Sequence, residues 1–179
     1  ALQAQGARVG ILDADIYGPS VPHMLGAPHQ RPTSPDNQHI TPIKAHGLSA
    51  NSIGFLMDED NATIWRGPMA SSALSQLLNE TLWDSLDYLV IDMPPGTGDI
   101  QLTLSQQIPV TGAVVVTTPQ DIALLDAVKG VSMFERVSVP VLGIVENMSM
   151  HICSNCGHHE AIFGTGGAEK MAQKYNVKV

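Results

Sequence analysis

The sequence has 179 residues, 44% of them hydrophobic and only 4% aromatic, and we expect one well-buried core and a single domain over residues 1–179. Its net charge of −8 argues against nucleic-acid partners, because phosphate backbones are bound mainly by Lys and Arg. No apolar run reaches the roughly 20 residues that span a bilayer, so we expect a soluble, cytoplasmic protein without a membrane partner.

The first third of the chain predicts one strand and one irregular segment. Residues 1–6 are typical of the last turn of a helix that stops at Gly6, and a strand follows within residues 7–15. Residues 18–64 contain prolines that break every helical pattern, so this segment is expected to be an irregular insertion with two short strands within 39–55.

The rest of the chain alternates helical and strand patterns. A helix is predicted after Pro68, and strands are predicted within residues 87–96, 112–119 and 139–148. A second helix is predicted from Asp121, as its cap, to about Phe134, with Ile122, Leu125, Val128 and Met133 as its inward side chains. This alternation predicts an α/β fold with a doubly wound, mainly parallel sheet flanked by helices.

Polar residues follow the predicted strands, at the edge where open α/β sheets bind ligands. Asp92 ends one strand and begins the segment D-M-P-P-G-T-G-D, whose first free amides belong to Gly96, Thr97 and Gly98. A carboxylate there suits a hydrated Mg²⁺, and the glycines allow an amide to approach a terminal phosphate. The alternative is a proline–glycine turn; with the whole segment present, we favour phosphate binding.

Two more carboxylates, Asp13 and Asp15, lie at the end of the first strand. Side chains two residues apart in a strand point to one face, and two such carboxylates repel each other unless a cation or water lies between them. This pair predicts Mg²⁺ and an attacking water; a solvated turn explains the pair taken alone equally well.

No segment of the form G-x-x-x-x-G-K-[ST] is present, since no lysine is followed by Ser or Thr. The glycine-rich stretch F-G-T-G-G-A-E-K at residues 163–170 follows the cysteine-containing loop and not a strand. We therefore interpret it as the start of a short helix, and not as a phosphate loop.

The only cysteines, Cys153 and Cys156, form a C-x2-C pair. In a reducing compartment such a pair is more often metal-binding or catalytic than a structural disulfide. His151 or His158 could complete a structural zinc site within one chain, and a thiol redox pair is a weaker third interpretation because Gly157 indicates a loop.

Taken together, several segments closely resemble the Mrp (ApbC-type) iron–sulfur cluster carrier ATPases. These belong to the deviant P-loop group, with the nitrogenase iron protein, ParA and MinD. The resemblance covers almost the whole chain and is carried by the following stretches: DADIYGPSVPHMLG, WRGPM, DYLVIDMPPGTGDIQLTL, VVVTTPQDIALLDAVKG, GIVENMSMHICSNCGHHEAIFG and GGAEKMA.

The resemblance implies a P-loop NTPase fold, ATP and Mg²⁺ as ligands, and a role for each matching residue. Asp15 corresponds to the carboxylate that positions the attacking water, Asp92 to the one that holds Mg²⁺ through water, and Gly96 to the amide near the γ-phosphate. Asn147 corresponds to the residue that contacts the adenine edge. Cys153 and Cys156 correspond to the pair that binds a [4Fe–4S] cluster.

The resemblance also implies partners. A [4Fe–4S] cluster takes four thiolates and each chain offers two, so a two-fold homodimer would supply them, and the cluster would pass to apo iron–sulfur proteins, with cluster assembly scaffolds as further partners. The family's phosphate loop would lie just before Ala1, and its last segment beyond Val179. We therefore expect a fragment of an ATPase that is inactive as it stands.

Overall fold

The computed structural model describes residues 1–57, 67–96 and 98–179. Three parts of the sequence predictions lie outside these described residues: the end of the 18–64 segment, the first two residues of WRGPM, and Thr97. The chain divides into two compact units, Ala1–Pro95 and Gly96–Val179, and each unit is described by itself.

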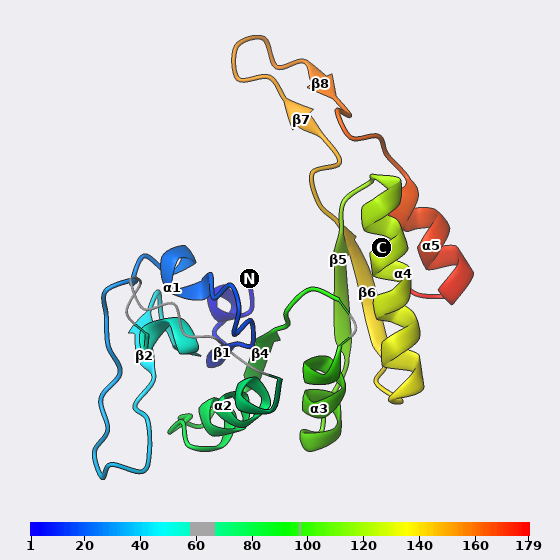
Figure 1. Ribbon diagram of the computed structural model, residues 1–179. Helices are drawn as coiled ribbons and strands as arrows, with labels where there is room; N and C mark the ends of the chain where they lie inside the picture. Colours follow the sequence, from blue (N-terminus) through cyan, green and yellow to red (C-terminus); the bar gives the residue numbers. More distant parts are fainter. Residues whose placement is uncertain (58–66, 97) are drawn as a thin grey trace. The chain divides into compact units, whose positions relative to one another are not determined.

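The first unit is built on a four-stranded sheet (Figure 1). Its strands, in the spatial order β2-β3-β1-β4, are β1 (Val9–Asp13), β2 (Ile43–Ala45), β3 (Leu48–Ser52) and β4 (Tyr88–Asp92). β1 runs parallel to both β3 and β4, and β2 is antiparallel to β3. The two short strands predicted within residues 39–55 therefore exist, and β3 belongs to the main sheet as the direct neighbour of β1.

Short helices and one long helix surround this sheet. They are η1 (Gln3–Gln5), α1 (Val21–Met24), η2 (Ile53–Phe55) and α2 (Gly67–Asn79). The predicted stop at Gly6 is confirmed, because this residue ends η1 with a φ of 91° that favours glycine. The long helix α2 buries one stripe, made of Ala70, Leu74, Leu77 and Leu78, as its spacing predicts.

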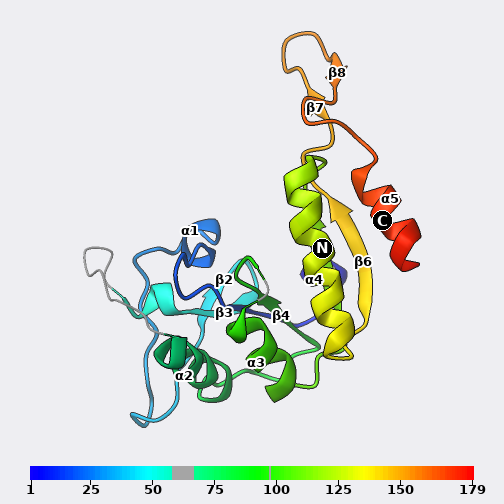
Figure 2. The same ribbon diagram turned by 45° about the vertical axis from the view of Figure 1, so that its right-hand side comes forward.

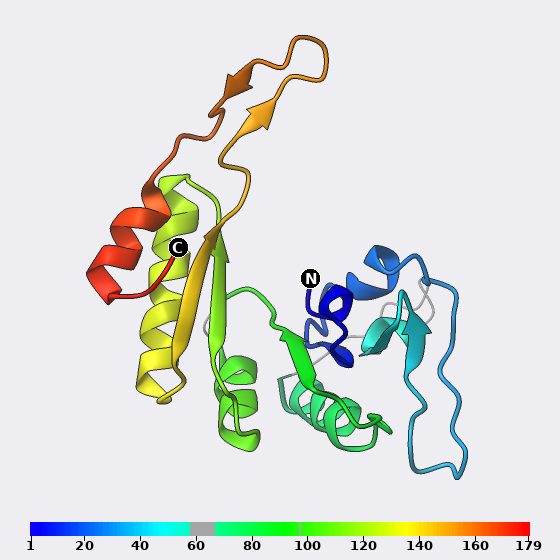
Figure 3. The same ribbon diagram turned by 180° about the vertical axis from the view of Figure 1, so that it is seen from behind.

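The second unit contains a parallel pair, β5 (Ala113–Thr117) and β6 (Val141–Glu146), and a small antiparallel hairpin, β7 (His151–Ile152) and β8 (His159–Glu160). Its helices are α3 (Asp99–Gln107), α4 (Asp121–Arg136) and α5 (Gly167–Tyr175). Figures 2 and 3 show α4 and α5 beside the β5–β6 pair. Val115, Ile144, Val131 and Met171 from these four elements pack into one core cluster.

The predicted fold class is confirmed: parallel strands lie at the four predicted places, flanked by helices. Two details of the prediction for α4 are wrong. Gln120, not Asp121, is its N-cap, and Ile122 and Leu125 are 77% and 62% exposed. The core-facing stripe of α4 runs through Ala127 and Val131, and at 100° per residue Ile122 falls on the opposite side.

Among the described residues, no helix is both long and apolar enough to cross a membrane.

Candidate functional site

Asp13, the last residue of β1, is a fully buried carboxylate that protein donors surround. It accepts hydrogen bonds from the Asp15 amide (3.1 Å), the Val21 amide (3.2 Å) and the Ser52 hydroxyl (2.9 Å). Burial raises the pKa of Asp13, and these three hydrogen bonds oppose that rise. Asp13 therefore ties the end of β1 to β3 and to the start of α1.

Asp15 lies beyond the end of β1, so the strand alternation that predicted a shared direction with Asp13 does not reach it. Its carboxylate accepts hydrogen bonds from the amides of Tyr17 (3.1 Å) and Gly18 (3.0 Å), which closes a turn in the loop before α1. Protein donors already contact the carboxylate of Asp13, and whether Asp13 and Asp15 form a cation-binding pair stays a prediction.

Asp92 supplies a second accessible carboxylate, after Asp15, at the edge of the sheet where β1 and β4 end. It ends β4 directly opposite Asp13 in the β1–β4 register, and its carbonyl oxygen accepts the Ala14 amide at 2.8 Å. Asp92 is exposed, but partial desolvation of its carboxylate, and to a smaller extent the negative charge of Asp15, raise the pKa of Asp92. Asp15 and Asp92 therefore lie close enough to repel, an arrangement that a hydrated divalent cation stabilises.

Gly96 follows four residues after Asp92 in the chain. Its φ is 98°, in the region that favours glycine, and a Cβ built on it would meet nothing within 4 Å. A backbone with this conformation and this open space allows a ligand to approach the main chain closely.

Asn147 directly follows β6 and is exposed. Its amide donates to the Thr117 carbonyl at 2.8 Å, which fixes it to the end of β5. Its side-chain oxygen accepts the amide of Met148 at 2.9 Å, and Met148 adopts a φ of 58°. The carboxyl edge of the β5–β6 pair thus presents an amide side chain on a fixed backbone.

Cys153 and Cys156 lie in the turn of the β7–β8 hairpin, which projects from the end of β6, away from α4 and α5 (Figures 1–3). Both thiols are free. The Cys153 amide donates to His158 O (2.9 Å) and the Gly157 amide to Cys153 O (2.8 Å). Hydrogen bonds from the amides of Cys156 and Asn155 lower the pKa of Cys153, which favours the thiolate that binds soft metals.

The hairpin geometry bears on the two other interpretations of the cysteines. Within the part of the chain that the structure describes, no three His, Cys, Asp or Glu side chains are grouped as a metal site, so neither His151 nor His158 completes a zinc site here. The pair occupies a hairpin turn, and not the start of a helix after a strand, where redox C-x2-C pairs usually lie.

The sequence interpretation missed the role of Glu146, the last residue of β6. Its carboxylate accepts the amides of Gly166 (3.3 Å) and Ala168 (2.7 Å) at the start of α5, and these bonds lower its pKa. The interpretation of F-G-T-G-G-A-E-K as a helix start is confirmed, since Gly166 caps α5. The amides that resembled a phosphate loop are already bound to a carboxylate of the same chain.

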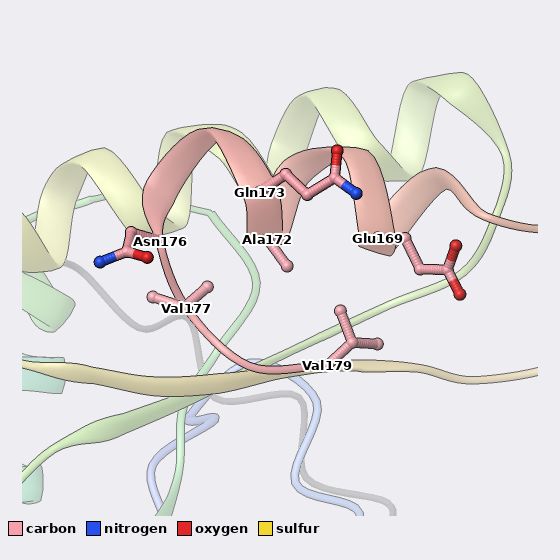
Figure 4. Close-up of a pocket in the computed structure, with 6 residues that line it drawn as sticks. All are labelled: Glu169, Ala172, Gln173, Asn176, Val177 and Val179. Atoms are coloured by element: carbon pink, nitrogen blue, oxygen red, sulfur yellow. The ribbon is translucent and has the colours of Figure 1, made fainter.

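A surface pocket elsewhere in the second unit contains none of the predicted site residues (Figure 4). It lies between α5 and the terminal segment, where Ala172 faces Val179. Its polar lining residues are Glu169, Gln173 and Asn176, none of them a predicted site residue, so we assign it no role in the chemistry.

Comparisons with known proteins agree on a family. The family model described as "ParA: NUBPL iron-transfer P-loop NTPase" matches residues 1–179. An iron–sulfur cluster carrier protein of Haemophilus influenzae is 96% identical, and one of Escherichia coli 75% identical, over all of this chain and 48% of theirs. An iron–sulfur cluster transfer protein of mouse, NUBPL, is 52% identical over 96% of this chain and 53% of its own. The chain thus spans about half the length of these curated relatives.

Solved structures support the same assignment. A nucleotide-binding protein from Archaeoglobus fulgidus, in complex with ADP, is 37% identical with a TM-score of 0.81, over 98% of this chain and 70% of that one. The MinC:MinD complex of Aquifex aeolicus matches at 16% identity and a TM-score of 0.53, over 80% of this chain and 57% of that one. The second match indicates a shared fold only.

Proposed function

This chain belongs to the ParA family of P-loop NTPases, of the NUBPL iron-transfer type, and we propose that it is part of an ATP-dependent iron–sulfur cluster carrier. In this proposal the carrier holds a [4Fe–4S] cluster between two copies and transfers it to apo iron–sulfur proteins. Cluster assembly scaffolds are further partners, and the transfer takes place in the cytoplasm. The observation that carries the proposal is the projecting hairpin with two free thiols in its turn, in a chain whose relatives are named as cluster carriers.

The thiol count supports a shared cluster. A [4Fe–4S] cluster takes four cysteine thiolates, and the hairpin supplies two, Cys153 and Cys156. A two-fold axis between two hairpins would bring four equivalent sulfurs together. A cluster held half by each subunit can be released when the two subunits separate, and this suits a carrier better than a permanent cofactor site.

The acidic edge of the first unit supports nucleotide hydrolysis. Asp92 is proposed to hold Mg²⁺ through water, and Asp15 to orient the attacking water. Asp92 ends β4 and is exposed, and Asp15 lies two residues beyond the end of β1. Mg²⁺, when bound, would neutralise charge on the phosphates. Gly96 is proposed to offer its amide to the γ-phosphate, and Asn147 its side chain to the adenine.

This chain contains no lysine-bearing phosphate loop, so we propose that ATP is bound by a protein that includes one and that the 179 residues alone do not hydrolyse it. Tight phosphate binding needs several preorganised amides and a lysine. Gly96 and Asn147 alone would supply two or three hydrogen bonds of about 1 kcal/mol net each, less than the cost of immobilising the ligand.

Anaerobic reconstitution tests the cluster proposal. Incubation of a full-length family member with ferrous iron and sulfide should give broad visible charge-transfer absorption and about four iron and four sulfide per dimer. One zinc per chain without sulfide would reject the proposal in favour of a structural zinc site.

A further inference from the structure

The β7–β8 hairpin carries both thiols but has little structure of its own to hold it in place. Its ladder consists of only two residue pairs, His151 with Glu160 and Ile152 with His159. Isolated two-stranded hairpins of ordinary length are marginally stable in water, and this one is shorter and exposed on both strands. The direction in which the thiols point must therefore depend on how the two stems are fixed at their base.

Glu146 lies at that base and contacts both stems. On the outgoing side, the Ser149 hydroxyl donates to one of its carboxylate oxygens at 3.0 Å. On the returning side, the same oxygen accepts the Gly166 amide at 3.3 Å, and the other accepts the Ala168 amide at 2.7 Å. The carboxylate thus closes the segment 147–165 as a loop.

Both ends of this closure are anchored in the core of the second unit. Glu146 belongs to β6, and Ala168, fully buried, belongs to the core cluster together with Met171. Gly167 allows the close approach of α5 to α4, since a Cβ there would lie 2.3 Å from a methyl group of Leu124. A bond between Glu146 and Ala168 therefore joins two fixed elements and leaves the hairpin stems little freedom.

The carboxylate also replaces a missing helix cap. Gly166, the N-cap of α5, has no side chain to satisfy the first amides of the helix. A negative charge at this position is further stabilised by the helix dipole, which is consistent with the lowered pKa of Glu146.

We propose that Glu146 is a positioning residue of the cysteine hairpin: its carboxylate locks the two stems to the start of α5 and so sets the direction in which Cys153 and Cys156 present their thiols. Its effect on a bound cluster rests on the proposed function; its effect on the hairpin itself does not.

Three variants of a full-length family member, numbered as here, test the proposal: Glu146→Ala, Glu146→Gln and the control Glu160→Gln, which removes an exposed charge on β8. After reconstitution with iron and sulfide, the rate of cluster loss to an iron chelator at 25 °C should rise about tenfold or more in Glu146→Ala, as for other residues that orient metal ligands. The rate of cluster loss in Glu146→Gln, which keeps one acceptor oxygen, should lie between those of the wild type and Glu146→Ala. The rate in Glu160→Gln should match the wild type.

Hydrogen exchange provides a readout that needs no cluster. In the apo-protein, the amides of Gly166, Ala168, Cys153 and Gly157 should exchange at least about tenfold faster in Glu146→Ala than in the wild type or the control. If the wild type binds no cluster but these amides respond, the proposed function fails and the positioning role stands.

The melting temperature separates positioning from general stabilisation. Faster cluster loss with a melting temperature within a few degrees of the control supports positioning. A lowered melting temperature with unchanged cluster loss, or equal effects of Glu146→Ala and Glu160→Gln, would overturn the proposal. If Glu146→Ala fails to fold, the same comparison is made with Glu146→Gln.

Discussion

The acidic edge of the first unit and the cysteine hairpin of the second are held in opposite ways. Asp13 is fully buried and bound to residues of β3 and α1, so the edge that carries Asp15 and Asp92 is tied to the core through Asp13. Cys153 and Cys156 lie in the turn between the two-residue strands β7 and β8, and the contacts that fix this hairpin lie at its base. Loss of Asp13 should therefore alter folding together with function, whereas changes in the hairpin should alter function alone.

The largest effect is expected from Cys153→Ala and Cys156→Ala. Each variant should lose cluster binding completely in anaerobic reconstitution, because the remaining thiolates cannot complete the cluster. The free energy of unfolding from urea titration should stay within about 0.5 kcal/mol of the wild type, since neither side chain belongs to the core. A normal cluster in either variant would exclude that residue as an essential ligand.

At the acidic edge, Asp15→Asn and Asp92→Asn in a full-length family member should lower ATP turnover by about 100-fold or more, the usual size of a lost acid–base or water-orienting group. ATP affinity should change much less, because most of the binding energy comes from contacts to phosphates and base. Single-turnover hydrolysis measures the turnover, and equilibrium binding measures the ATP affinity. Unchanged turnover in both variants would reject their roles.

Asp13→Ala tests whether the edge is part of the core. It leaves the buried Ser52 hydroxyl and two amides without their acceptor, so unfolding free energy should fall by about 3 kcal/mol or more. Asp84→Ala is the matched control, because it removes only an exposed ion pair with Lys44, worth at most about 1 kcal/mol. Equal urea midpoints for the two variants would contradict the contrast between edge and hairpin.

The smallest effect is a pH dependence at the base of the hairpin. The pKa of Glu146 in the folded state is lowered, so its stabilising bonds are fully present above the ordinary glutamate pKa and are lost as the pH falls through the lower folded value. Exchange protection of the Ala168 amide should therefore be constant from neutral pH to about pH 5 and decline below it. In Glu146→Gln this decline should be absent; the same decline in both proteins would assign it to another group.

Local patterns in the sequence predicted most of the fold. Each predicted strand is a short apolar run followed by turn residues, and the stripe of α2 follows its helical spacing. The positions of Asp92 and of the C-x2-C pair follow from such local patterns as well. Whether they hold Mg²⁺ and a cluster stays a prediction.

Two features of the site that the sequence did not predict depend on contacts between residues far apart in the chain. The carboxylate of Asp13 is bound by Ser52 and Val21, which reach it only because β3 pairs with β1 and the chain turns into α1. Glu146 meets Ala168 only once α5 packs beside β6. No periodicity in either segment indicates these partners.

The central claim is that one cluster bridges two chains, and native mass spectrometry of the anaerobically reconstituted, full-length family member tests it most directly. We predict a species with the mass of two chains plus one [4Fe–4S] cluster, and the loss of the cluster from that species when iron is chelated. The Cys153→Ala variant should give no cluster-bearing species under the same conditions. A single chain that carries a complete cluster, or a dimer that carries one metal ion per chain and no sulfide, would contradict the claim.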